Sequence, residues 1–378
     1  MQIMKTVEKV PGGLMVVPLL LGALLNTIDQ MHIPFIMDIL KSLGVAAIEG
    51  KNGEVYYEFL KIGGFSEALF KNGAIPLIAL FLFCAGSQMN LKVGGKALKK
   101  GIILTVTKYG AGVLVGYLFG MMVDDPMNGF LGLSTIAIIA AMTNGNGGMY
   151  AALTSKFGNR SDIGAVSVLS LNDGPFFTMM ALGVMGSSFP VIAFIAVLLP
   201  IGIGMLLGNL DKDIREFLKH GEILPVPFFA FALGAGMNLG SFFNPAVVGG
   251  GVVLGLLTVF VGGIFMVIAM KIFREKSQVA AWAEASVAGN ATGTPAAIAA
   301  AAAVSASSGA MSAAEAQKFA DLVPIATAQI SIATITTALL CPVMVIVWDR
   351  YQRSKGIDAQ IEDEVPTTTE QQLESKVS

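Results

Sequence analysis

Charged residues are scarce in this sequence of 378 residues: Asp, Glu, Lys and Arg make up 13% of it, against roughly 25% in an ordinary soluble chain. Hydrophobic residues make up 54%, in uncharged stretches close to the roughly 20 residues that a helix needs to cross a bilayer. This composition argues against a soluble enzyme and indicates an all-α polytopic membrane protein, because a helix satisfies its own backbone hydrogen bonds in lipid. A formal net charge of −2 leaves no large basic patch, so we expect the lipid bilayer, and no nucleic acid, as a partner.

Residues that bind metals, form disulfides or catalyse reactions are also few. The two cysteines, Cys84 and Cys341, lie in apolar stretches, and the two histidines, His32 and His220, lie outside them. Neither the phosphate-binding motif GxxxxGK[ST] nor the zinc motif HExxH occurs. We therefore expect no catalytic residue, no metal site and no cofactor beyond a coupling ion, so that any transport draws its energy from an ion gradient.

Ten apolar segments have about the length that a membrane span requires. They lie near residues 11–28, 67–90, 101–122, 130–155, 163–186, 189–209, 223–241, 246–271, 279–304 and 322–348. The connections between them are alternately basic and nearly free of basic residues, and basic connections are typical of the cytoplasmic side. Both termini are then cytoplasmic, which requires an even number of spans and agrees with ten.

The chain divides near residue 188 into two halves that resemble each other. FLFCAGSQMNL at 81–91 resembles FAFALGAGMNL at 229–239, and Pro18, Gly22 and Asn26 correspond to Pro200, Gly204 and Asn209. Because each half has five spans, the second half enters the membrane from the opposite face, so residues 1–188 and 189–350 are expected to form inverted repeats. Residues 29–62 form an external segment, and the polar, acidic residues 351–378 are expected to be a disordered cytoplasmic tail.

The fourth span of each half is interrupted by a polar stretch, TNGNGG at 143–148 and AGNATGTP at 288–295. Irregular backbone at membrane depth is tolerated where it is buried in protein or lines a watery cavity, so we expect the two breaks to face each other. The half-helix after each break starts with free N–H groups that suit a small anion. The candidate substrate-binding residues are Asn144, Asn146, Gly147, Asn290, Thr292, Thr294, Gln88 and Gln329. The alternative is that these residues only permit close helix packing and interhelical hydrogen bonds.

Ionisable residues inside the spans are the candidates for proton or ion coupling. Asp173 leads them, beside Asn172 in LSLNDGPFF, because burial favours the neutral acid and the group could alternate between acid and carboxylate. Asp173 could instead be a structural partner of Lys108, which could also attract the substrate or reach the cytoplasmic surface. Glu284 is the remaining candidate, although a cap at the membrane interface is its simpler interpretation.

Six segments together resemble the 2-keto-3-deoxygluconate permease family. They are VPGGLMVVPLLLGALLNT, GGFSEALFKNG, AAMTNGNGGMYAALTSKFG, LSLNDGPFFTMMALG, LGNLDKDIREFL and PFFAFALGAGMNL. The resemblance covers about residues 5–348, and it implies a proton-coupled symporter of the bacterial inner membrane that imports this sugar acid. It also implies a fold similar to that of the bile acid and sodium symporters, with ten helices in two inverted repeats and two discontinuous helices that cross. The long external segment and the acidic tail depart from the family's pattern.

The residues and the resemblance agree on the substrate. A six-carbon keto acid has one carboxylate and several hydroxyls, which match helix N-termini and Asn and Thr side chains. The alternatives are a sodium-coupled carrier of another small organic anion on the same fold, and a membrane sensor without flux. The sequence carries no signal of oligomeric state.

Overall fold

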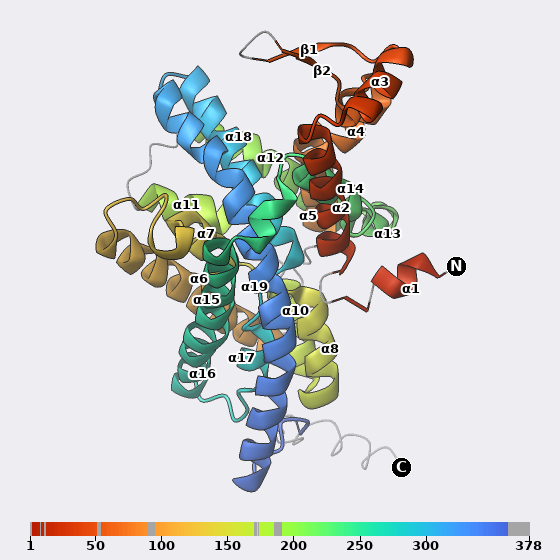
Figure 1. Ribbon diagram of the computed structural model, residues 1–378. Coiled ribbons are helices and arrows are strands. Elements are labelled where there is room, and N and C mark those ends of the chain that lie inside the picture. The colour runs from red at the N-terminus through yellow and green to blue at the C-terminus, as the bar shows by residue number, and fades with distance from the viewer. Residues whose placement is uncertain are drawn as a thin grey trace.

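The computed structural model describes residues 2–7, 9–10, 13–50, 54–88, 95–169, 172, 174–184 and 191–361. Helices of very different length pack side by side, and the longest, α19 (Ala313–Ser354), runs the length of the molecule (Figure 1). A small segment with two strands projects from one end of the bundle. The expected all-α architecture is confirmed.

The first half of the chain alternates long and short helices. Its elements are α1 (Ile3–Val7), α2 (Gly13–Gln30), α3 (Pro34–Ser42), β1 (Ile48–Glu49), β2 (Val55–Tyr56), η1 (Phe59–Lys61), α4 (Gly64–Phe70), α5 (Ala74–Gln88), α6 (Gly95–Met122), η2 (Phe130–Gly132), α7 (Thr135–Thr143), α8 (Gly147–Phe157), α9 (Arg160–Gly164), α10 (Val166–Leu169) and α11 (Phe176–Val184). The two strands form an antiparallel pair with Ile48 opposite Tyr56. The fifth span is also interrupted, because α10 ends at Leu169 and α11 begins at Phe176, with Gly174 at φ +92° between them.

The second half ends in the longest helix. Its elements are α12 (Val191–Leu210), α13 (Lys212–Lys219), η4 (His220–Glu222), α14 (Val226–Gly234), η5 (Leu239–Phe243), α15 (Pro245–Leu256), η6 (Leu257–Gly262), α16 (Gly263–Ile272), α17 (Val279–Glu284), η7 (Gly289–Gly293), α18 (Thr294–Ser307) and α19. The helix α19 starts at a capping box, in which Ser312 and Glu315 satisfy each other's backbone N–H groups. The helix thus begins nine residues before the apolar span expected from about residue 322, and its first turns carry the charged residues Glu315, Lys318 and Asp321.

Five helical segments of the described chain are long and apolar enough to cross a membrane. They are Gly13–Gln30, Gly95–Met122, Pro245–Ile272, Val279–Ser307 and Ala313–Ser354, and a sixth results if α4 and α5, bent by 62°, count as one span. The other expected spans correspond to helices that are shorter or broken, such as the pair α7 and α8. The sequence locates these segments but does not show how far each remains helical.

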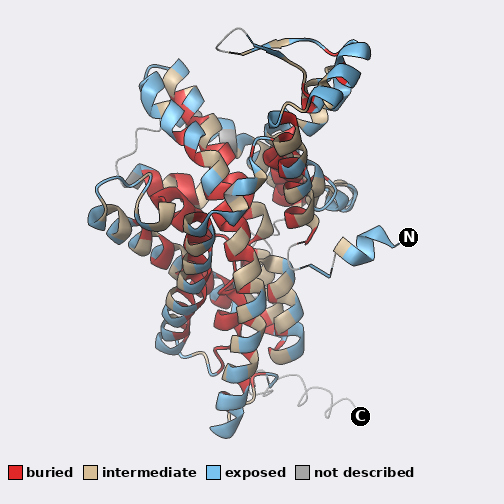
Figure 2. Ribbon diagram, viewed as in Figure 1, coloured by how far each residue is buried: buried red, intermediate tan, exposed pale blue. Residues whose placement is uncertain are grey.

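Buried residues gather where the helices meet (Figure 2), and many large apolar side chains are exposed on the outside of the bundle. On α6, Ile102, Val106 and Leu118 are exposed, and on α16 Ile268 and Ile272 are exposed. Large apolar side chains on the outside of long apolar helices are expected when the solvent is lipid. The chain is a multi-pass membrane protein.

The two halves interlock through glycines that the repeat comparison pairs. In the first crossing, α2 packs on α14, with Gly22 against the backbone of Phe231 and Gly234 against that of Leu19. The second crossing is reciprocal: α5 packs on α12, with Gly86 against Ile201 and Gly204 against Phe83. The first helix of each half thus packs against the second helix of the other half, as expected for two related repeats. The paired residues Met89 and Asn90 lie outside the described residues.

Two further polar contacts follow the same exchange between the halves. Lys71, before α5, donates hydrogen bonds to the Asn26 side chain and to the Ala235 carbonyl at the end of α14. Arg215, before α14, donates to the Asn209 side chain, and its carbonyl accepts from Gln88 at the end of α5. Asn26 and Asn209, which correspond in the two halves, therefore each accept a hydrogen bond from a basic side chain.

The chain is ordered beyond the expected start of the tail. The helix α19 continues to Ser354, and the Gln360 side chain donates a 2.8 Å hydrogen bond to the Lys156 carbonyl. The described chain thus reaches Ile361 and includes the first part of the segment 351–378 for which we expected disorder. Residues 362–378 lie outside the described part.

Candidate functional site

The two breaks expected from the sequence are present, and they touch. The chain leaves helical geometry between α7 and α8 and again between α17 and α18. The Ala288 amide donates to the Asn144 carbonyl at 3.3 Å, and the Asn146 amide donates to the Ser286 hydroxyl at 3.0 Å. The half-helix α17 packs against α8, and α18 against α7. The expectation that two discontinuous helices face each other is confirmed.

A buried ion pair lies at this crossing. Lys108 Nζ is 3.0 Å from Glu284 Oε1, with side-chain exposures of 1% and 0%. The same ammonium donates to the carbonyls of Glu284 at 2.7 Å and Ser286 at 2.9 Å. It therefore neutralises both a carboxylate and the carbonyl end of α17, where a helix carries partial negative charge.

This pairing corrects two sequence-based interpretations. Glu284 is fully buried in the bundle, so it is not a cap at the membrane interface. Lys108 points inward to the second break, so it does not reach the cytoplasmic surface. The sequence did not suggest this pairing because α6 and α17 lie in different halves of the chain.

The Glu284 carboxylate also faces the first break. Its Oε1 accepts a 3.2 Å hydrogen bond from Asn172 Nδ2, and a Cβ atom at Gly145 would overlap the carboxylate. Its Oε2 is buried and has no hydrogen-bond partner among the described residues. A buried carboxylate oxygen without a donor is uncommon and costly, so this atom has unmet hydrogen-bonding capacity at the crossing.

Asn144 connects three segments. Its Nδ2 donates to the Ala140 carbonyl at 2.7 Å, its Oδ1 accepts from the Gly174 amide at 2.9 Å, and its carbonyl accepts from Ala288. Asn144 therefore ties the breaks of the fourth, fifth and ninth spans together, through its side chain and its backbone carbonyl. In this conformation both the amide nitrogen and the amide oxygen of its side chain are bound within the protein, so Asn144 positions the site.

The remaining substrate candidates near the breaks differ in accessibility. Asn146 caps α8 through the Met149 amide, directly before Gly147, the first residue of that helix. Thr292 is buried and donates to the Gly289 carbonyl at 2.7 Å. Thr294 Oγ1 and Asn290 Oδ1 are buried without a partner among the described residues. The unpartnered atoms mark η7 and the start of α18 as a place where a ligand could complete the hydrogen bonding.

Two candidates, Gln88 and Gln329, are not brought into this group. Gln88 binds Ser87 and the Arg215 carbonyl, on α13. Gln329 donates to the Leu131 carbonyl at 3.0 Å, against α15, although its Oε1 lacks a partner among the described residues. Asp173, the leading coupling candidate, lies outside the described residues.

Sequence reasoning missed a row of small polar side chains on α19 that supports the second break. Thr337 accepts a 3.0 Å hydrogen bond from the Val287 amide, Thr327 donates to the Thr292 carbonyl at 3.2 Å, and Cys341 donates to the Ala285 carbonyl at 3.0 Å. These contacts satisfy backbone groups that the break removes from helical pairing. With Thr334, which donates to the Ala288 carbonyl at 3.4 Å, such residues recur every three to seven positions along this helix, and that recurrence was the available signal.

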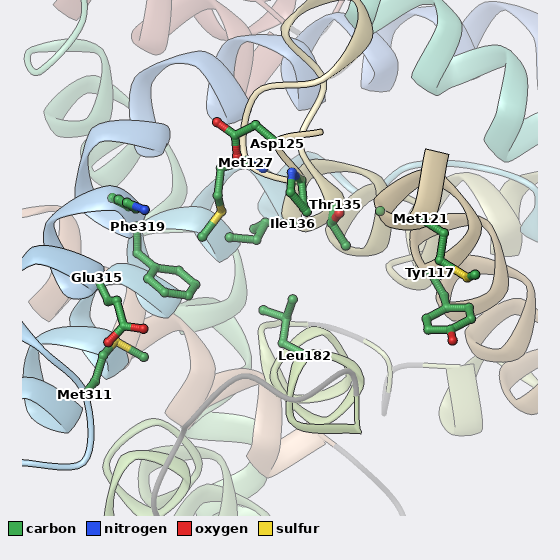
Figure 3. A pocket seen from close by; sticks show the side chains of 13 residues that line it. Tyr117, Met121, Asp125, Met127, Thr135, Ile136, Leu182, Met311, Glu315 and Phe319 are labelled. Atoms are coloured by element: carbon green, nitrogen blue, oxygen red, sulfur yellow. Dashed lines mark hydrogen bonds between the residues drawn. The ribbon is translucent and has the colours of Figure 1, made fainter. Parts of the chain in front are cut away.

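A cavity of about 540 Å³ lies elsewhere, between α6, α7, α11 and α19 (Figure 3). Tyr117, Met121, Thr135, Leu182, Glu315 and Phe319 are among the residues that line it. Its lining is mainly apolar, and none of the break residues contributes to it. Asp125, Glu315 and Lys318 supply its charged groups, so this cavity is separate from the crossing of the two breaks.

Comparison with known proteins agrees with this architecture. The family described as 2-keto-3-deoxygluconate permease matches residues 4–47 and 53–354. The chain is 45% identical to 2-keto-3-deoxygluconate permease 1 of Salmonella typhimurium, over 91% of this chain and 94% of that protein. It is 33% identical to the 2-keto-3-deoxygluconate permease of Escherichia coli strain K12, over 96% of this chain and 98% of that protein. A solved sodium proton antiporter from Methanocaldococcus jannaschii has a similar fold, with a TM-score of 0.52 at 17% identity over 94% of this chain and 99% of that chain.

Proposed function

This chain belongs to the 2-keto-3-deoxygluconate permease family, and we propose that it imports 2-keto-3-deoxygluconate together with protons across a bacterial inner membrane. Membership makes it a transporter and not an enzyme. The alternation of basic connections supports cytoplasmic termini. We propose together the substrate, the coupling ion, the membrane in which the chain lies and its orientation there.

The observation that carries proton coupling is the buried pair of Glu284 and Lys108. Protonation of Glu284 would leave the Lys108 ammonium without its counter-charge in a site that excludes water, and a nearby anion would restore the balance. Proton and sugar acid would then favour each other's binding, as symport requires. Among the described residues, Tyr150 on α8 and Cys341 on α19 are further titratable groups close enough to Glu284 to interact with it electrostatically.

A proton suits this site better than a sodium ion. The Lys108 ammonium, 3.0 Å from Glu284 Oε1, occupies the position beside the carboxylate that a metal cation would need. Sodium coupling would require the ammonium to move away and several further oxygen atoms to take its place. A sensor without flux would keep the pocket but would have no need of an ion pair at the crossing.

Replacing Glu284 by glutamine should abolish accumulation of 2-keto-3-deoxygluconate driven by a pH gradient, because the amide keeps the shape of the side chain but cannot exchange a proton. Uptake is measured in proteoliposomes, with and without a sodium gradient. Asp173→Asn is measured in parallel, since Asp173 remains the candidate suggested by the sequence. If Glu284→Gln accumulates as much substrate as the parent, Glu284 is not the proton carrier. If a sodium gradient alone drives accumulation, sodium and not the proton is the coupling ion.

Asn144→Ala and Thr292→Ala should each weaken binding of the sugar acid by roughly 5- to 150-fold, the range for losing a buried hydrogen bond worth about 1–3 kcal/mol. Both side chains hold the breaks in place through buried hydrogen bonds. Binding is measured by isothermal titration calorimetry on detergent-solubilised protein. Lys318→Ala, an exposed position on α19, is the control that should bind as the parent does. Unchanged affinity in both break variants would move the substrate site elsewhere.

A further inference from the structure

A second cavity lies between the start of α2 and the second break. Its volume is about 330 Å³, within the range of roughly 300–1,000 Å³ that is common for ligand pockets. Met15 at the start of α2, Phe81 on α5 and Val226 on α14 form its apolar wall, and Asn290 on η7 and Glu222 on η4 supply its polar groups. A residue of the break and a carboxyl group from the α13–α14 connection thus share one cavity.

Glu222 is the ionisable group among the described residues that line this cavity. Burial raises its pKa from 4.5 to about 7, against the opposing attraction of Lys219 on α13. Lys219 itself is exposed and pairs with Glu216 at 3.2 Å. From α5, the facing titratable group is the Cys84 thiol, against which Gly221 packs. A group with this pKa changes charge across the neutral range.

We propose that Glu222 links occupation of this cavity to protonation: the sugar acid sits beside Asn290 while Glu222 is neutral, and it leaves when Glu222 ionises. The proposal rests on the proposed function. Two carboxylates in one partly dehydrated cavity repel each other strongly, whereas the neutral acid can donate a hydrogen bond to the ligand.

This arrangement would assist release of the substrate. In the proposed orientation the basic helix α13, and with it Glu222, faces the cytoplasm. A proton lost from Glu222 to the cytoplasm would place a negative charge next to the bound anion. Glu222 would thereby act at the exit of the pathway, whereas Glu284 would act at the crossing.

The sign and size of the pH effect follow from linkage. Below a pKa of about 7 Glu222 is neutral and the cavity accepts the anion, and above it Glu222 is charged and affinity falls. The sugar acid's own carboxylate stays ionised throughout this range. If the neutral form is required, the apparent dissociation constant should rise about tenfold between pH 6 and pH 8.

The test is calorimetric titration of the full, detergent-solubilised chain with 2-keto-3-deoxygluconate at pH 6 and pH 8. The parent should show the tenfold change, and Glu222→Gln should bind at both pH values as the parent binds at pH 6. Glu216→Gln, an exposed position on the neighbouring helix α13, should retain the full change. Lys219→Gln, which leaves Glu222 in place, should move the midpoint upward by a fraction of a pH unit, because an exposed cation contributes little.

The remaining outcomes separate this inference from the proposed function. Asn290→Ala should weaken binding at both pH values and keep the ratio of the dissociation constants at pH 8 and pH 6. Unchanged binding in this variant would show that the substrate does not bind in this cavity. A tenfold change that persists in Glu222→Gln would overturn the role of Glu222 and assign the proton linkage to another group, first Glu284. If the parent binds no 2-keto-3-deoxygluconate at either pH, the proposed function fails instead.

Discussion

Replacing Lys108 by methionine is expected to lower the free energy of unfolding by about 3–5 kcal/mol, because the buried Glu284 carboxylate would lose its compensating charge. Water cannot take the place of the ammonium, since the two side chains are 1% and 0% exposed. The variant would also leave the carbonyls of Glu284 and Ser286 without their shared donor. Denaturant unfolding of the purified protein in detergent measures the loss.

The double variant Lys108→Met, Glu284→Leu should recover much of this stability, because neither buried charge remains. Lys318→Met removes an exposed lysine from α19 and should leave stability within the ordinary range of a surface change. Equal losses in the single and the double variant would show that the ion pair is not the source of the effect.

Gly204→Ala should destabilise the crossing of α12 and α5 by about 1–3 kcal/mol or more. A Cβ atom at this position would overlap the carbonyl of Phe83. Backbone atoms cannot rotate away as a side chain can, so the two helices would have to separate. The measurement is the midpoint of thermal unfolding in detergent, together with the yield of monodisperse protein.

Gly202→Ala provides the matched control on the same helix. A Cβ at Gly202 meets no atom within 4 Å, and alanine is the better helix former by roughly 0.5–1 kcal/mol. We therefore expect Gly202→Ala to be neutral or slightly stabilising. A similar loss in both variants would indicate that loss of glycine itself, and not the close crossing, is responsible.

The sequence predicted the parts of this fold that depend on local composition. Apolar stretches located the spans, and the clusters TNGNGG and AGNATGTP located the two breaks, because glycine and polar residues interrupt helices wherever they gather. The repeat comparison matched Gly22 with Gly204 and Gly86 with Gly234, the positions where helix backbones come closest. Small residues are common where membrane helices cross closely, so the matched glycines indicate a close crossing as well as a sequence repeat.

The pairing of side chains could not be predicted in the same way. Lys108 and Glu284 are separated by 176 residues, and which face of α6 meets the second break depends on the rotation of every helix between them. The row of hydroxyl groups on α19 was missed for a similar reason: threonine is common in apolar helices, and only the position of the break shows that Thr327 and Thr337 serve it.

The reciprocal packing of the first helices has a consequence for biosynthesis. Gly22 on α2 meets its partner helix α14 only after about 200 further residues have been made, which takes roughly 10–40 s at common translation rates. During that time α2 lies in the membrane without α14, and α5 lies there without its partner until α12 has been made. A truncated chain that stops before α12 would lack the partner helices of both α2 and α5, so the first half is not expected to form a stable unit by itself, and membrane chaperones and proteases would meet the incomplete chain first.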